Sequence, residues 1–186
     1  SATPTAGIKI EFYRVSDATT PVGTATSGAD GKFSFSIPTN GEVVNGYLKA
    51  TISGYVDNYM YSTSPLFADY SADANMVTTG AFAGLGFVTG QMQNLGFVAA
   101  VVLDGSDAAV AGAAVSSTPS TGTTYMYSNS SGIPANGSGT NTDGQAYFIN
   151  LPAGDVEITA TKAGVTFHAH TVQGHPGALT TTTITP

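Results

Sequence analysis

The three histidines of the chain lie close together in the sequence, at His168, His170 and His175. His168 and His170 are two residues apart in a segment predicted to be a strand, so both imidazoles should point to one face. Imidazole nitrogen is a ligand for copper, zinc and iron. The spacing therefore predicts a transition-metal site (Cu, Zn or Fe), with His175 from the next turn as a third ligand. The alternative interpretation is three surface histidines that bind no metal.

Four tyrosines, Tyr55, Tyr59, Tyr61 and Tyr70, form a second group, in a stretch that also contains Asp and Asn. An exposed tyrosine presents an apolar ring and a polar hydroxyl, which suits stacking on sugars and hydrogen bonding to them. The group predicts a carbohydrate-binding surface, although the chain has no Trp. The alternative is that these rings cover the core of a first domain as part of a wrapping loop.

Oxygen donors in the same stretch predict a calcium site as another alternative, because Ca²⁺ binds carboxylate and amide oxygens. These residues are Asp57, Asn58, Asp69, Asp73 and Asn75. Their spacing matches neither an EF-hand nor a calcium-binding nonapeptide repeat. The acidic loop is therefore a weaker pattern than the histidine group.

The sequence lacks motifs for nucleophilic and dinucleotide chemistry. No Gly-x-Ser-x-Gly elbow occurs, and no carboxylate lies near the histidines in the sequence to orient them. The glycines Gly84, Gly86 and Gly90 have neither the spacing nor the preceding strand of a dinucleotide fingerprint. We therefore predict that the protein is not an enzyme.

The composition is typical of a β-rich extracellular protein. Only 9% of the 186 residues are charged, against about a quarter in ordinary soluble domains. The net charge is −7 and the five basic residues are scattered, which argues against nucleic-acid binding. There is no Cys, and no apolar stretch of about 18 residues predicts a membrane span. The start Ser1-Ala2-Thr3-Pro4 indicates a processed N-terminus, so we expect a secreted or cell-surface protein.

The candidate histidines, tyrosines and acidic residues are expected on strands and the loops between them. Short apolar or alternating segments recur along the chain with turn residues between them, which is typical of strands. The predicted strands are 7–15, 22–26, 32–37, 47–53, 76–79, 96–103, 109–117, 124–127, 145–151, 155–162, 165–172 and 178–185. This pattern predicts an all-β fold of antiparallel β-sandwiches. The stretch 80–94 has near-helical spacing of apolar residues but three internal glycines, at 84, 86 and 90, and predicts a linker with a short helix.

One hairpin motif occurs twice. Asp30-Gly31 precedes the alternating segment 32–37, and Asp143-Gly144 precedes the apolar segment 145–151. Asp-Gly favours a tight turn, since glycine adopts positive φ without steric cost. A proline follows each segment and ends it. Two copies of the motif predict two related domains.

These motifs resemble the carboxypeptidase regulatory-like domain, a transthyretin-like sandwich of seven strands. In the first copy the matching residues are Thr26, Asp30-Gly31, Phe33, Phe35, Pro38, Tyr47, Ala50 and Gly54-Tyr55. In the second copy they are Val101–Gly105, Ala111–Val115, Thr142–Gly144, Phe148, Leu151–Gly154, Ile158, Ala160 and Gly164. The resemblance implies two transthyretin-like or immunoglobulin-like domains of a secreted bacterial-type protein. The family is an accessory module of many secreted proteins, so the resemblance implies a fold more than a function.

The His-x-His segment is also similar to that of the intradiol dioxygenases, a distantly similar sandwich family that holds ferric iron with two Tyr and two His. Tyr125 and Tyr127 would be the neighbouring tyrosines in this chain. The resemblance requires a further tyrosine after the Pro-x-Gly turn, and residues 155–157 are Asp-Val-Glu instead. Dioxygenase chemistry is therefore not predicted.

The two copies differ in two respects. The second has one more residue between its Asp-Gly turn and its proline, which predicts a β-bulge. The first lacks the leading strand, because segment 7–15 matches the family's second strand and only six residues precede it. Proteins normally cover an unpaired sheet edge. We expect the cover to come from residues 76–100 of the same chain, with strand addition by a neighbouring chain as the alternative.

The sequence thus predicts a first domain (1–79) with a wrapping loop (56–75), a linker (80–94) and a complete second domain (95–186). The predicted function is a secreted, non-catalytic structural or adhesive protein of the cell surface. Its partners would be copies of itself, joined by strand addition into an oligomer or filament, or a cell-surface component. Carbohydrate binding through the tyrosines and metal binding through the histidines are the alternatives.

Overall fold

The computed structural model describes residues 4–186, and these residues form thirteen β-strands and one α-helix. The N-terminal region (residues 4–79) contains β1 (Lys9–Arg14), β2 (Gly23–Thr26), β3 (Gly46–Thr51) and β4 (Asn58–Tyr61). Helix α1 (Thr79–Thr89) follows. The C-terminal region (residues 95–186) contains β5 (Gly96–Val102), β6 (Ala114–Thr118), β7 (Thr124–Ser128), β8 (Pro134–Ala135), β9 (Gln145–Leu151), β10 (Gly154–Lys162), β11 (Val165–Thr166), β12 (His170–Gly174) and β13 (Leu179–Ile184). The predicted all-β class is confirmed.

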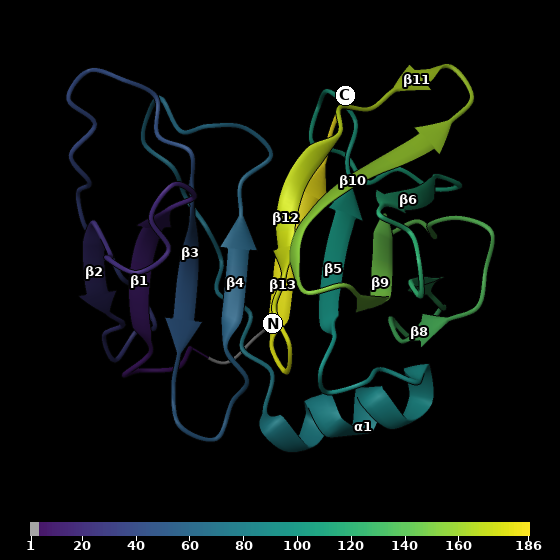
Figure 1. Cartoon of the computed structure of the whole chain (residues 1–186), viewed down its shortest axis with the longest axis horizontal. Helices are drawn as coiled ribbons and strands as arrows, with labels where there is room; N and C mark the ends of the chain where they lie inside the picture. Colours follow the sequence, from purple (N-terminus) through teal and green to yellow (C-terminus); the bar gives the residue numbers. More distant parts are fainter. Residues whose placement is uncertain (1–3) are drawn as a thin grey trace.

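One nine-stranded sheet runs through both regions, in the order β2-β1-β3-β4-β13-β5-β9-β7-β8 (Figure 1). Strand β13 joins the regions, because it pairs in parallel with β4 on one side and with β5 on the other. The other pairs in this sheet are antiparallel. The division of the chain into two domains remains a prediction.

The C-terminal region is a two-layer sandwich. Strand β10 pairs with β6, β11 and β12 to form a second sheet, and β10 and β12 lie across β5 and β13 (Figure 1). Alternate residues of the two layers face each other and form one core, as expected for half-buried strands. Its fully buried members include Val98, Val102, Phe148, Val156, Ile158 and Val172.

The N-terminal region has only one layer of strands. The inner face of β1, β3 and β4 carries a separate core that includes Ile10, Phe12 and Leu48. Segments 32–37 and 66–76 cover this core. The prediction of a strand at 32–37 is wrong, because a strand requires a hydrogen-bonded neighbour and residues 33–37 have no backbone partner within the described chain. Their predicted alternation is nevertheless present, with Phe33, Phe35 and Ile37 half-buried and the residues between them exposed.

Residues 76–100 add no strand to the N-terminal sheet, so the expected cover of its open edge by these residues is wrong. Strand β13 pairs with β4, whereas residues 79–89 form α1 and β5 pairs with β13 and β9. Two further predictions are corrected. The wrapping loop 56–75 contains β4, and 76–79 forms no strand beyond a bridge between Tyr55 and Thr78. No helix in residues 4–186 is long and apolar enough to cross a membrane.

The C-terminal end of helix α1 is hydrogen-bonded to the bulge in β9. The Thr78 hydroxyl caps the helix by accepting a hydrogen bond from the Ala81 amide at 3.2 Å, and Gly90 ends it with a φ of 75°. The predicted bulge lies in β9, where the register with β5 shifts near Asn150. Asn150 has a φ of 61°, accepts from the Met92 amide at 2.7 Å and donates to the Gly90 carbonyl at 3.1 Å. The extra residue therefore holds the end of the helix.

Candidate binding groove and the junction beside it

The three histidines do not converge on one point. The predicted strand 165–172 is interrupted, so His168 lies in a loop and is exposed, while His170 begins β12. Because the strand is interrupted, His168 and His170 do not share the strand face on which a metal-binding pair depended. Within residues 4–186 no group of three or more His, Asp or Glu side chains is placed to hold a metal ion. The geometry therefore does not support the predicted three-histidine site.

His170 takes part in a hydrogen-bonded link between the two regions. Its Nε2 atom lies 2.9 Å from the Thr182 hydroxyl, and that hydroxyl donates to the Tyr61 carbonyl of β4 at 3.0 Å. The hydroxyl hydrogen is used in the second bond, so His170 Nε2 must carry the donated proton in the first. Burial lowers the pKa of His170 to about 4. His170 is therefore a neutral structural donor at neutral pH.

His175 packs in an aromatic cluster at the same junction. Its ring stacks on Tyr59 with centroids 3.5 Å apart and an interplanar angle of 10°. Its Nε2 atom lies 3.2 Å from the Tyr61 hydroxyl. Burial, with a contribution from the positive charge of Lys49, lowers the pKa of His175 to about 4. Tyr47 stacks on Tyr61 at 4.9 Å and extends the cluster across β3 and β4.

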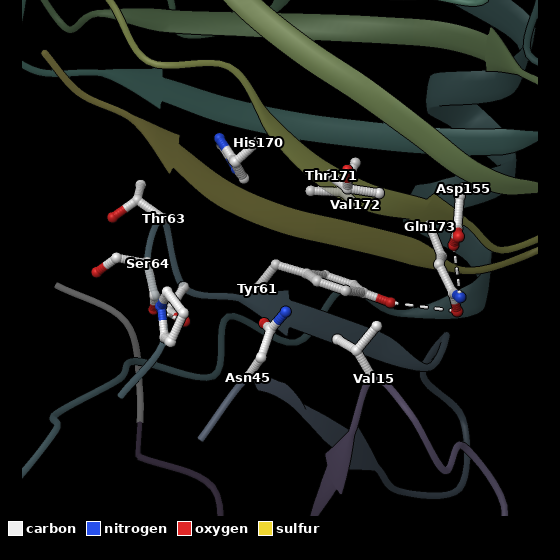
Figure 2. Close-up of a pocket in the computed structure, with 12 residues that line it drawn as sticks. Val15, Asn45, Tyr61, Thr63, Ser64, Asp155, His170, Thr171, Val172 and Gln173 are labelled. Carbon is white, nitrogen blue, oxygen red and sulfur yellow. Dashed lines mark hydrogen bonds between the residues drawn. The ribbon is translucent and has the colours of Figure 1, made fainter. Parts of the chain in front are cut away.

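A small crevice opens beside this cluster, between the loop after β4 and strand β12 (Figure 2). Its volume is about 180 Å³. The Tyr61 hydroxyl donates to Gln173 at 3.4 Å, and the Gln173 amide donates to Asp155 at 2.8 Å. Burial, with contributions from Tyr47 and Asp155, raises the pKa of Tyr61 far above its ordinary value. The polar groups of the crevice thus bond to one another, and the space is smaller than the ~300–1,000 Å³ of ordinary ligand pockets.

The four predicted carbohydrate-binding tyrosines lie in two places. Tyr59 and Tyr61 belong to the aromatic cluster, and Tyr61 is buried. Tyr55 and Tyr70 line a large groove elsewhere in the N-terminal region. The tyrosines therefore do not form a single stacking platform, and Tyr55 and Tyr70 are the two that line a large open space.

The predicted calcium ligands are also dispersed. Asp57 pairs with Lys49 at 3.0 Å. The buried Asn58 side chain donates to the Asn75 carbonyl at 3.1 Å and accepts from Thr181 at 3.2 Å. Asp69 and Asp73 line the groove. Asp57 and Asn58 therefore have a structural role, because their bonds hold β4 to the neighbouring segments.

The groove has a volume of about 1350 Å³, far more than the crevice beside the aromatic cluster. Its floor is the apolar inner face of β1 and β3, with Ile8, Ile10, Phe12 and Leu48. One wall is segment 32–37, and the other wall is segment 66–76. The rim includes Phe67, whose side chain is 83% exposed, and Tyr70, which is 52% exposed. Exposed aromatic side chains on an apolar groove are typical of a surface that binds a partner.

The two walls are fixed to opposite sides of the sheet. Phe35 and Ile37 pack so closely over Gly23 of β2 that an added Cβ there would lie 2.5 Å from the Phe35 ring. On the other side, Leu66 pairs with Val44, and the Asn75 carbonyl accepts from Asn58 of β4. The space between the walls therefore lies over the middle strands, β1 and β3.

Sequence reasoning missed this groove, because it treated segment 32–37 as a paired strand and 56–75 as a complete cover. The signal lay in the difference between the two copies, because in the described chain no strand pairs with segment 32–37 as β5 pairs with β9.

No family model matches the sequence, and no curated protein matches it. Among solved structures, the chain is similar to the minor pilin GBS52 of Streptococcus agalactiae (13% identity, 98% of this chain and 83% of that chain, TM-score 0.35). It is also similar to the shaft pilin SpaA of Lactobacillus rhamnosus GG (11%, 99% and 89%, TM-score 0.30). The TIE protein of Bacillus anthracis matches with 16% identity over 96% of this chain (TM-score 0.32), and the chain spans 30% of the length of that protein. At these TM-scores the likeness carries no inference, so function is argued from the residues of this chain.

Proposed function

We propose that the protein is a secreted, non-catalytic structural unit of the cell surface that assembles with copies of itself by strand addition to its N-terminal region. The observation that supports this most directly is the extended segment 32–37, whose residues 33–37 have no backbone hydrogen-bond partner within the described chain. Unpaired extended backbone accepts a further strand readily. The low charged content, 9%, agrees with an extracellular protein.

The test is the oligomeric state over a range of protein concentrations, measured by light scattering and electron microscopy. We expect oligomers or filaments that grow with concentration. Replacing the exposed Ser34 and Ser36 by Lys should reduce assembly, because lysines on an open strand oppose the approach of another strand. Ser130→Lys with Ser131→Lys, two exposed positions in the C-terminal region, is the matched control and should assemble normally. A strict monomer at high concentration would refute the proposal.

A second candidate function is carbohydrate binding in the groove, favoured by the position of Tyr55 and Tyr70 on its lining. Binding on a glycan array should then weaken in Tyr55→Ala and Tyr70→Ala. Tyr13→Ala, on a strand of the same region but outside the groove lining, is the control. Glycan binding that survives both groove substitutions would remove this candidate.

A further inference from the structure

We infer that the groove between segments 32–37 and 66–76 is a receptor site for one extended polypeptide strand that has apolar side chains at alternate positions and carries basic residues. The inference rests on the proposed function and specifies its acceptor site and the chemistry of its ligand. Four properties of the groove support it, namely the unpaired backbone of its walls, its apolar lining, its size and its charge.

The walls contain backbone N–H and C=O groups that no residue of the described chain pairs. Neither residues 33–37 nor residues 67–72 make a backbone hydrogen bond within the described chain. Both stretches border the same groove. Backbone N–H and C=O groups are strong hydrogen-bonding groups, and water is their present partner where they are exposed. A β-strand carries alternating donors and acceptors along its edges, so it matches such walls.

The apolar lining favours a ligand with period-two apolar side chains. The floor formed by β1 and β3 is itself buried, since Ile10 is 0% exposed and Phe12 is 3% exposed. The apolar surface that a ligand can contact therefore includes the half-buried Phe33, Phe35 and Ile37, which alternate along one wall with exposed residues. The residues of a bound strand would alternate in the same way, with every second side chain against this wall.

Size and charge narrow the choice of ligand. A volume of about 1350 Å³ exceeds the ~300–1,000 Å³ typical of small-molecule sites, and so indicates a polymer. The charged residues on the lining are Asp30, Asp69, Asp73 and Lys32, so carboxylates outnumber the single ammonium group. An acidic groove favours a strand with basic residues, and its field would accelerate association at low salt. The apolar residues that alternate along segment 32–37 favour a polypeptide strand over an oligosaccharide.

The experiment is fluorescence polarisation with a labelled nonapeptide that alternates valine with threonine and carries two lysines. We expect saturable binding by the wild-type chain. A scrambled peptide of the same composition, in which the valines no longer alternate, should bind at least roughly tenfold more weakly, which corresponds to ~1.4 kcal/mol. A peptide with glutamates in place of the lysines should also bind more weakly, and the difference should shrink at high salt.

Two pairs of variants locate the site. Ala68→Trp fills the groove from an exposed position and should abolish binding, while Ala83→Trp on the exposed face of α1 should leave it unchanged. Asp69→Lys with Asp73→Lys should weaken binding of the lysine peptide and restore that of the glutamate peptide. The exposed Glu157→Lys on β10 is the charge control. Circular dichroism of each variant establishes that it is folded.

The outcomes separate this inference from the proposed function. Absence of saturable peptide binding, equal binding of the scrambled peptide, or binding only of an oligosaccharide would overturn the inference, even if the chain still assembles. Peptide binding that Ala68→Trp abolishes, in a chain that remains a strict monomer, would support the receptor site and refute self-assembly. Loss of both peptide binding and assembly in Ala68→Trp would support both.

Discussion

The N-terminal and C-terminal regions contain the same Asp-Gly turn followed by an aromatic segment, yet the two segments have different neighbours. In the C-terminal region, β9 lies between β5 and β7 and is hydrogen-bonded on both sides. In the N-terminal region, segment 32–37 alternates exposed and half-buried residues and has no strand beside it. The C-terminal region possesses a leading strand, β5, and the N-terminal region does not. A strand is thus specified by its neighbours as much as by its own pattern.

The junction between the two regions, where β13 pairs with β4, differs from both of them. Strand β13 belongs to the C-terminal region but completes the edge of the N-terminal sheet through β4. His170 and His175 lie beside this strand pair, where they contact Thr182, Tyr59 and Tyr61. The regions are therefore joined by backbone pairing, by stacked rings and by two neutral imidazoles.

The largest effect is expected from truncating the aromatic residue of the closed core. Phe148 is fully buried and meets the Tyr125 ring edge-on at 5.7 Å, so Phe148→Ala should lower the free energy of unfolding by about 3–5 kcal/mol. Phe35, the counterpart in the N-terminal region, is only half-buried, so Phe35→Ala should cost about 1–2 kcal/mol. Urea titration followed by circular dichroism measures both. Equal losses would mean that the two cores are equally closed.

The bulge residue should give the next largest effect. Asn150→Ala removes the side-chain bonds to Met92 and Gly90 and forces alanine into a positive φ, so it should cost about 2–3 kcal/mol. Asn150→Gly keeps the backbone conformation at low cost and should lose only about 1–2 kcal/mol. Hydrogen exchange should increase at residues 90–92 in both variants. If glycine were as damaging as alanine, the backbone conformation would not contribute.

The junction should weaken in acid. The pKa values of His170 and His175 are about 4 in the folded chain, below the ordinary value near 6.5, so the unfolded chain binds more protons between these pH values. Their contribution to stability is complete above about pH 6.5 and is lost as the pH falls towards 4. The thermal midpoint measured from pH 7.5 to 4 should therefore decline.

The control for this pH dependence is the double variant His170→Gln with His175→Gln, which has no group that titrates in the same range at these positions. It should be less stable than the wild type at pH 7.5, and its thermal midpoint should decline less between pH 6.5 and 4. Parallel curves for the two proteins would show that other groups cause the acid sensitivity.

The smallest effect is expected for the exposed ion pair at the junction. Lys49 and Asp57 lie 3.0 Å apart with partly exposed side chains, so Asp57→Asn should cost no more than about 1 kcal/mol. The loss should shrink in 1 M salt, because salt screens exposed charges. A loss that is large and independent of salt would show that Asp57 acts through a buried bond instead.

Much of the fold follows from local sequence. Alternation in 7–15, the apolar run 96–103 and the segment 178–185 after a turn predicted three strands of the large sheet, and the extra residue between Asp143 and Pro152 predicted the bulge. The capping threonine and the glycine at Gly90 delimit the helix that the sequence predicted as short. These features depend on backbone conformations and side-chain periods that neighbouring residues determine. The sites were harder to predict, because His168 and His170 were placed on a continuous strand that tertiary packing interrupts.

The sequence by itself determined the all-β class, the turns and the inward face of segment 32–37, because each of these is a property of nearby residues. Only the tertiary structure decided that β13 pairs with β4, that Tyr59 and Tyr61 meet His175, and that segments 32–37 and 66–76 border a groove. These outcomes depend on contacts between residues up to 123 positions apart, such as Thr181 and Asn58, whose pairing no local pattern encodes.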